Sequence, residues 1–266
     1  MPAPLATPAP VGAPEPNGLV VFVTDFGAQD TYAAQMVGAL LNANPRARVA
    51  AGFHAVPPQN VPAGADSLGE LAAAFPIGTC FVTVVDPGVG TDRPVLAAAC
   101  GGMLHVAPDN GLLAPLLGRD PAAEVVRLAV PGRASATFHG RDVMAPAAGR
   151  LTRGEPLHAL GEPISAWRPL DRPGAEKNGD AAVGRVARAD RFGNLITDIP
   201  AAAVPDAATL TIGDRTVRCA RTYADVDPGE PVALVGSNGC WELAVRNGSA
   251  AALHNLGPGA PAELRP

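Results

Sequence analysis

The sequence predicts an α/β N-terminal domain with a largely parallel sheet flanked by helices, followed by a small all-β C-terminal domain that is antiparallel and barrel-like. Three observations support this fold class. Residues 19–24 and 79–85 are continuous apolar, β-rich runs, as in strands buried on both faces. Helical patterns alternate with such runs in the first half of the chain. Beyond residue 180 only short strand patterns separated by turn residues follow.

The N-terminal elements are predicted in chain order. Residues 1–17 are mostly Pro and Ala and are expected to form a disordered tail, because dense proline blocks both helix and sheet. The N-terminal domain is predicted over 18–168. Its strands are expected at 19–24, 79–85, 95–99 and 104–106, and its helices at 31–44, 63–75 and 144–151.

The second domain begins after a change in composition. Residues 169–180 are rich in Pro, Gly and charge and are predicted to be a linker, with the C-terminal β domain over 181–266. Strands are expected at 182–187, 194–198, 209–212, 232–235 and 241–245. Turn pairs such as Pro228-Gly229 and Asn238-Gly239 separate them.

Composition excludes several classes of protein. The chain has 266 residues and a net charge of −5 without a block of Lys or Arg, which disfavours nucleic-acid binding. No apolar stretch approaches the ~20 residues of a membrane span, and the N-terminus lacks the pattern of a signal peptide. The expected location is therefore cytoplasmic. The four cysteines are not at CxxC spacing, so a zinc ribbon is not expected.

Three polar clusters interrupt the apolar runs of the first domain. Asp25 and Asp86 each follow a predicted strand, at the sheet edge where α/β proteins bind ligands. Asp25 suits a ribose diol, although a helix-capping role is an equal alternative. Asp86 and Arg93 flank a Gly-rich loop and can form an ion pair, functional or merely structural. His139 lies at a predicted helix start, where either a catalytic or a structural role is open.

The second domain carries a trio of different chemistry. Asp190, Phe192 and Asn194 offer a carboxylate for an ammonium group, a ring for a base face and an amide for a base edge. Ser237 and Trp241 form a second polar and aromatic group. Each group is also compatible with an ordinary hairpin turn.

Taken together, the motifs resemble those of the S-adenosylmethionine (SAM) hydroxide adenosyltransferase family, which are adenosine-forming SAM hydrolases related to fluorinase and chlorinase. The resemblance extends from Leu19 to Leu264 through VTDFG, VPPQN, VVDPGVGTDR, APDNGLL, TFHGRD, DRFGNLIT and NGCWELAVRNGSA. It implies hydrolysis of SAM to adenosine and L-methionine by attack of water at the ribose C5′. It also implies a homotrimer with active sites between one subunit's N-terminal domain and its neighbour's C-terminal domain.

The resemblance also assigns roles to residues. Asp86, Arg93 and His139 match the family's water-handling set, and their presence favours a hydrolase over a halogenase. Asp25 is expected to bind the ribose hydroxyls, Asp190 the methionine ammonium, Ser237 the methionine carboxylate, and Asn194 and Phe192 the adenine. Further substrate contacts are expected from Phe26, Gly140, Trp241, Val245 and Asn247. Neither a metal nor a cofactor is expected, since SAM is the substrate.

Some segments depart from the family pattern, and other functions stay open. Ala51-Gly52-Phe53-His54 replaces an Asp-x-Thr-His segment, and Asn238-Gly239-Cys240-Trp241 replaces Ser-Gly-Tyr-Leu. The alternatives are a SAM-dependent halogenase, a non-catalytic SAM- or adenosine-binding module, and a metal-dependent phosphoesterase. The last would use as ligands Asp25, Asp86, Asp109, His139 and Asp142.

Overall fold

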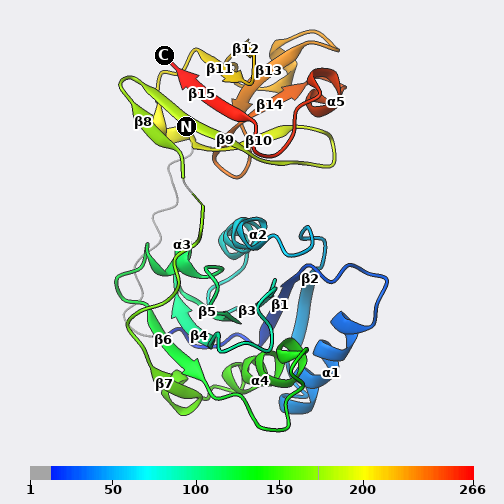
Figure 1. Ribbon diagram of the computed structural model, residues 1–266, viewed down its shortest axis with the longest axis vertical. Helices are drawn as coiled ribbons and strands as arrows, with labels where there is room; N and C mark the ends of the chain where they lie inside the picture. The colour runs from blue at the N-terminus through cyan, green and yellow to red at the C-terminus, as the bar shows by residue number, and fades with distance from the viewer. Residues whose placement is uncertain (1–12, 173) are drawn as a thin grey trace. The chain divides into compact units, whose positions relative to one another are not determined.

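The computed structural model describes residues 13–172 and 174–266, which form two compact units that meet in the chain between Asp171 and Arg172 (Figure 1). Residues 1–12 of the predicted tail lie outside the described residues. Its last residue is bound to the first unit: the backbone N–H of Asn17 donates to the Gly78 carbonyl at 3.1 Å, and its side-chain amide donates to Thr79 Oγ1 at 3.0 Å.

The first unit is built on a seven-stranded sheet in the order β2-β1-β3-β5-β4-β6-β7. Its strands are β1 (Leu19–Thr24), β2 (Arg48–Phe53), β3 (Cys80–Val84), β4 (Val95–Cys100), β5 (Met103–Pro108), β6 (Glu124–Leu128) and β7 (Gly161–Pro163). Its helices are α1 (Tyr32–Ala43), α2 (Val61–Ala74), α3 (Ala114–Leu117), the π-helical turn η1 (Gly140–Met144), α4 (Ala145–Thr152) and the 3-10 turn η2 (Leu157–Ala159).

The sheet is mixed, so the prediction of a largely parallel sheet was wrong. Strands β2, β1, β3 and β5 run parallel, whereas β4, β6 and β7 pair antiparallel to their neighbours. The cause is the two-residue turn between β4 and β5. Gly101 and Gly102 have φ values of +58° and +76°, the left-handed conformation that a tight hairpin needs and that glycine adopts easily.

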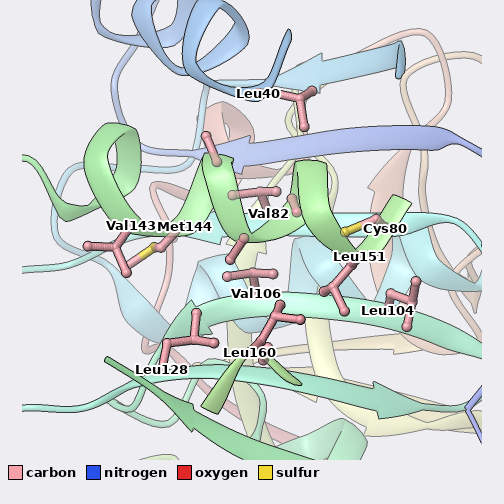
Figure 2. Close-up of a cluster of buried hydrophobic side chains, with 14 of the residues drawn as sticks. Leu40, Cys80, Val82, Leu104, Val106, Leu128, Val143, Met144, Leu151 and Leu160 are labelled. Atoms are coloured by element: carbon pink, nitrogen blue, oxygen red, sulfur yellow. The ribbon is translucent and has the colours of Figure 1, made fainter. Parts of the chain in front are cut away.

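Alternate side chains of the sheet enter two separate cores. Val20 and Phe22 point to the face covered by α1 and α4, and Val21 and Val23 point to the face covered by α2. Figure 2 shows the first core, with Leu40, Met144 and Leu151 against the side chains of β3 and β5. Because both faces are covered, polar chemistry is confined to the edge where the strands end.

The second unit is an eight-stranded antiparallel sheet that almost closes on itself, which confirms the predicted barrel-like β unit. Its main path is β12-β11-β15-β9-β10-β14-β13, with β8 paired to β9. After β12, Cys219 bridges to Ala233 of β13, which joins the two ends of the path. The elements are β8 (Glu176–Asn178), β9 (Ala181–Ala189), β10 (Leu195–Pro200), η3 (Ala201–Ala203), β11 (Thr209–Ile212), β12 (Arg215–Arg218), η4 (Tyr223–Asp225), β13 (Pro231–Val235), β14 (Cys240–Val245), α5 (Ala250–His254) and β15 (Pro261–Arg265).

Two features of the second unit differ from expectation. Strand β8 lies inside the predicted linker and pairs with the start of β9 through Asn178 and Ala181. The short helix α5 is capped by the Ser249 side chain, which accepts from the backbone N–H of Ala252 at 3.1 Å. Across the two described ranges, no helix has the length and apolar character needed to cross a membrane.

Candidate active site

The mixed sheet brings three chain segments to one edge. Asp25 follows β1 and Asp86 lies two residues after β3, so both stand where parallel strands end. Strand β4 runs the opposite way, and its first residue, Val95, pairs with Pro108, the last residue of β5. The start of β4 therefore lies at the same edge. A short loop is then enough to place Arg93, just before β4, beside Asp86.

Asp86, Arg93 and His139 form one hydrogen-bonded set. Arg93 Nε donates to Asp86 Oδ1 at 2.7 Å, and Arg93 Nη2 bonds to Asp86 Oδ2, which gives a bidentate ion pair. The same Nη2 lies 3.1 Å from His139 Nδ1, and Nη1 donates to the Pro94 carbonyl at 3.3 Å. The Asp86 and Arg93 side chains are only 5% and 4% exposed, so this pair is shielded from water.

His139 reaches this pair because two loops touch. His139 immediately precedes η1, and Gly90 of the 87–92 loop packs against the segment before it. Gly90 has φ +81°, and a Cβ there would lie 2.5 Å from the Ala136 carbonyl oxygen. Only glycine permits both the backbone conformation and the contact. The Gly-rich loop thus has a packing role in addition to carrying Asp86 and Arg93.

The arrangement decides the protonation of His139. Burial lowers the pKa of His139, and the adjacent Arg93 charge lowers it further, against the opposing effects of Asp86 and Asp142. A guanidinium can only donate, so Nδ1 of the neutral ring must accept and the hydrogen must sit on Nε2. His139 therefore presents an N–H donor on its other side.

Asp25 is held by a residue that the sequence analysis did not single out. Its Oδ2 accepts from the backbone N–H of Gln59 at 2.8 Å, and Gln59 has a left-handed φ of +61°. The turn that follows Asp25 is fixed by His54, whose Nδ1 lies 2.8 Å from Thr24 Oγ1 and whose carbonyl accepts from Gly27. Residues 51–54, which differ from the family pattern, thus support the turn that carries Asp25.

A cavity of about 610 Å³ opens at this edge of the sheet. Asp25, Asp86 and His139 line it, whereas Arg93 lies behind them and is not in its wall. Phe26, Tyr32 and Phe138 line another part of the wall and pack edge to face, with ring centroids 5.4–5.9 Å apart. Gly140 completes the wall beside His139, where a Cβ would lie 3.1 Å from the Met36 sulfur.

In the second unit, Asp190 organises its own turn. Its Oδ1 accepts from the backbone N–H groups of Phe192 and Asn194 at 2.8 and 2.9 Å, and its Oδ2 accepts from the Asn194 side-chain amide at 3.0 Å. Asn194 is buried, but Phe192 is 76% exposed. The aromatic ring of Phe192 is therefore open to solvent beside a turn that is fixed by the hydrogen bonds of Asp190.

The remaining predicted residues of this unit are in different environments. Ser237 is exposed in the turn between β13 and β14, and Asn247 is exposed at a left-handed φ of +58°. Trp241 and Val245 instead pack into the core of the unit, and the buried Trp241 Nε1 has no hydrogen-bond partner within the described part of the chain. The sequence analysis also missed Tyr223 and Glu242, whose contact spans 19 positions and has no local signal.

The proposed metal-ligand set is not gathered in one place. Asp109 does not line the cavity, and its Oδ1 accepts from the backbone N–H of Arg168 at 2.8 Å. Asp142 is paired with Arg141. Among residues 13–172 and 174–266, no three His, Cys, Asp or Glu side chains are arranged to hold a metal ion.

Comparison with known proteins agrees with this architecture. A solved structure of an uncharacterized conserved protein from Thermotoga maritima superposes with a TM-score of 0.86 at 30% identity, covering 93% of this chain and all of that one. Residues 20–161 match the SAM hydroxide adenosyltransferase N-terminal domain, and residues 184–263 match the C-terminal domain of that name. The chain belongs to the SAM hydroxide adenosyltransferase family.

Two curated relatives bear on the branch of the family. The (R)-S-adenosyl-L-methionine hydrolase of Thermus thermophilus is 39% identical over 256 residues, covering 92% of this chain and 98% of the relative. A fluorinase from Actinoplanes sp. is 26% identical, with 91% and 96% of the two chains covered. The chain is therefore more similar to this hydrolase than to this fluorinase.

Proposed function

We propose that the protein hydrolyses S-adenosyl-L-methionine to adenosine and L-methionine by attack of water at the ribose C5′. The observation that carries this proposal is the buried Asp86–Arg93–His139 set, two members of which face a cavity large enough for a nucleoside. The relatives named hydrolase at 38–39% identity support the same reaction.

The geometry supports a different task for each of the three residues. His139 Nε2–H can donate to the oxygen of a water, and the Asp86 carboxylate can accept one of its hydrogens. Arg93 has no place at the cavity wall, so it acts by fixing Asp86 and His139 relative to each other. Asp86 rather than His139 is then the proton acceptor, since Nδ1 is occupied by Arg93.

The bond changes need no further group. The water oxygen forms a bond to C5′ as the bond from C5′ to the sulfonium sulfur breaks, and the electron pair of that bond stays on sulfur. Methionine leaves as a neutral thioether, so no acid has to protonate it. The proton of the water passes to Asp86 and from there to solvent. Holding the water in line supplies most of the advantage.

The substrate contacts are likewise proposals. Asp25 would bind the ribose hydroxyls through Oδ1, since Oδ2 is taken by Gln59. Asp190, Asn194, Phe192 and Ser237 would bind the ammonium, the adenine edge, the adenine face and the methionine carboxylate. Phe26, Gly140, Trp241, Val245 and Asn247 would contribute further contacts, the core residues Trp241 and Val245 through their backbone. No metal or other cofactor takes part.

The proposed assembly rests on the family resemblance, and the proposed location on the composition of the chain. The residues proposed to bind the ribose and the water belong to the first unit, and those proposed to bind methionine and adenine belong to the second, so the proposed site uses both. We propose a homotrimer in which neighbouring subunits supply these two halves, located in the cytoplasm. Light scattering of the purified protein measures its mass, and a monomer at micromolar concentration would contradict the trimer.

The decisive experiment uses ¹⁸O-labelled water. The purified protein is incubated with SAM in this water in the presence of a chelator, and the products are followed by mass spectrometry. Adenosine labelled at its 5′ oxygen together with unlabelled methionine is expected. Product formed only with added chloride or fluoride would indicate a halogenase, and product lost in chelator a metal enzyme. Binding without turnover under all these conditions would indicate a SAM-binding module.

A further inference from the structure

Glu242 is a buried carboxylate in the second unit with no assigned role. It lies on β14, is 5% exposed, and its Oε1 accepts from the Tyr223 hydroxyl at 2.6 Å. Tyr223 belongs to η4, which is closed by a reciprocal capping box between Thr222 and Asp225. The phenol therefore comes from a turn that is closed by its own hydrogen bonds, and it ties that turn to β14.

The other oxygen of Glu242 lies under the turn that carries Ser237. A Cβ placed on Gly236 would lie 2.5 Å from Glu242 Oε2, so the carboxylate packs directly against the backbone at the start of this turn. The turn is closed by Gly236 N–H donating to the Cys240 carbonyl at 2.9 Å and Gly239 N–H donating to the Gly236 carbonyl at 3.0 Å. The carboxylate therefore lies against the first residue of a turn whose conformation is set by its own backbone hydrogen bonds.

Asp190 lies in the same part of the unit: Glu242 pairs in register with Ile196 of β10, and Asp190 is hydrogen-bonded to Asn194, the residue that precedes β10. Burial, the hydrogen bond to Glu242, and the charges of Glu242 and Asp190 raise the pKa of Tyr223 to about 12. Burial raises the pKa of Glu242 and the Asp190 charge adds to that rise, whereas the hydrogen bond from Tyr223 and the charge of Arg188 oppose it. One buried carboxylate thus connects the Ser237 turn, the Tyr223 turn and the surroundings of Asp190.

We propose that Glu242, clamped by Tyr223, is a positioning residue for the amino-acid end of the substrate. The inference rests on the proposed function, in which Ser237 binds the carboxylate of methionine and Asp190 its ammonium. Those two groups are separated by a single carbon, so their partners must be kept at one fixed separation. Glu242 maintains this separation by packing against Gly236, the first residue of the turn that carries Ser237.

The test compares SAM with a sulfonium that lacks the amino-acid end, 5′-dimethylsulfonio-5′-deoxyadenosine. Glu242→Ala is expected to raise KM for SAM about tenfold while kcat stays within about twofold. Its kcat/KM for the truncated sulfonium is expected to match the wild type. Glu242→Gln, whose amide oxygen can still accept from Tyr223, should restore KM for SAM to within about threefold of the wild type.

Two further variants alter the contacts of the Glu242 carboxylate without changing Glu242 itself. Gly236→Ala puts a methyl group against Oε2, and Tyr223→Phe removes the clamp at a side chain that is 42% exposed. Both should raise KM for SAM with little effect on the truncated sulfonium. Tyr223→Phe decides the matter if Glu242→Ala fails to fold. The matched control is Glu230→Ala, an exposed carboxylate of the same unit, which should behave as wild type.

The outcomes separate this inference from the proposed function. Equal losses on both substrates, or an unchanged KM for SAM in Glu242→Ala and Tyr223→Phe, would overturn the positioning role. Absence of SAM turnover in the wild type would overturn the proposed function alone. In that case calorimetric dissociation constants for SAM, measured on the same variants, still test whether Glu242 positions the binding turn.

Discussion

The two units hold their polar groups in different ways. In the first unit, Asp86, Arg93 and His139 come from separate segments and bind one another, and the Asp86–Arg93 pair is almost fully shielded from water. In the second unit, Asp190 binds the backbone of its own turn, and the neighbouring Phe192 is largely exposed. The three side chains of the first set are bonded to one another, whereas in the second unit the ring of Phe192 is exposed to solvent.

This difference fits a division in which the first unit carries out catalysis and the second binds the outer parts of the substrate. Side chains that are fixed by one another and buried are suited to act on a reacting atom, because their orientation is set before substrate arrives. Exposed groups on a bonded turn are suited to bind the distant parts of a substrate. Changes in the first set should therefore affect turnover, and changes in the second should affect affinity.

The largest effect is expected from Asp86→Ala and His139→Ala. Each should lower kcat by about 10²–10⁴-fold, because the water loses its proton acceptor or its donor. The dissociation constant for SAM, measured by calorimetry, should change by less than about threefold. Asp92→Ala, which removes an exposed carboxylate from the same loop, is the control and should retain wild-type turnover. Wild-type turnover in both test variants would show that the set does not handle the water.

An intermediate effect is expected from pH. Protonated His139 carries a hydrogen on Nδ1 and cannot accept from Arg93, so turnover should fall as pH drops through its pKa. Burial and Arg93 place that pKa below the 6.5 of a free imidazole. Below the midpoint kcat should fall about tenfold per pH unit. A midpoint above 6.5, or no loss at acid pH, would contradict the assigned tautomer.

Acid unfolding has to be separated from this titration. His105 is buried in β5, and burial lowers its pKa to about 4. As pH falls below 6.5 the unfolded chain takes up this proton first, so stability is lost between pH 6.5 and about 4. Circular dichroism at each pH shows whether the chain is still folded where turnover is lost, and His105→Phe should lessen the acid unfolding.

The smallest effect is expected from Phe192→Ala. Loss of the ring that we propose to stack on adenine should raise KM for SAM about tenfold and leave kcat within about twofold. The side chain is 76% exposed, so thermal stability should not change. Leu253→Ala, another exposed apolar side chain of the same unit, provides the control. A fall in kcat at constant KM would contradict the assignment of substrate binding, rather than turnover, to the second unit.

Much of the fold could be predicted because its signals are local. The runs at 19–24 and 79–85 became β1 and β3, and the apolar periods at 31–44 and 144–151 became α1 and α4. Strand β2 was missed because it is mostly exposed and reads RVAAGF, with little β-branched content. The direction of β4 depends on the Gly101-Gly102 turn, and the alternation of helices and strands along the chain gives no sign of it.

Contacts of the site were predictable only where the two residues lie close together in the sequence. Asp86 and Arg93 lie on one loop, so their pairing could be expected from their spacing, and the structure shows it. The contacts of Asp25 with Gln59 and of Glu242 with Tyr223 join residues 34 and 19 positions apart through the fold, and no periodicity reports them. Roles toward a bound substrate stay predictions, since they depend on groups outside the chain.

The bonding of Arg93 has a consequence for how this scaffold can diversify. Its guanidinium makes two bonds to Asp86 and one to the Pro94 carbonyl, and none of these three bonds involves residue 139. Residue 139 can therefore be substituted without leaving the buried Arg93 cation unpaired. Substitution at position 139 would change the group that faces the cavity while the buried Asp86–Arg93 ion pair is kept.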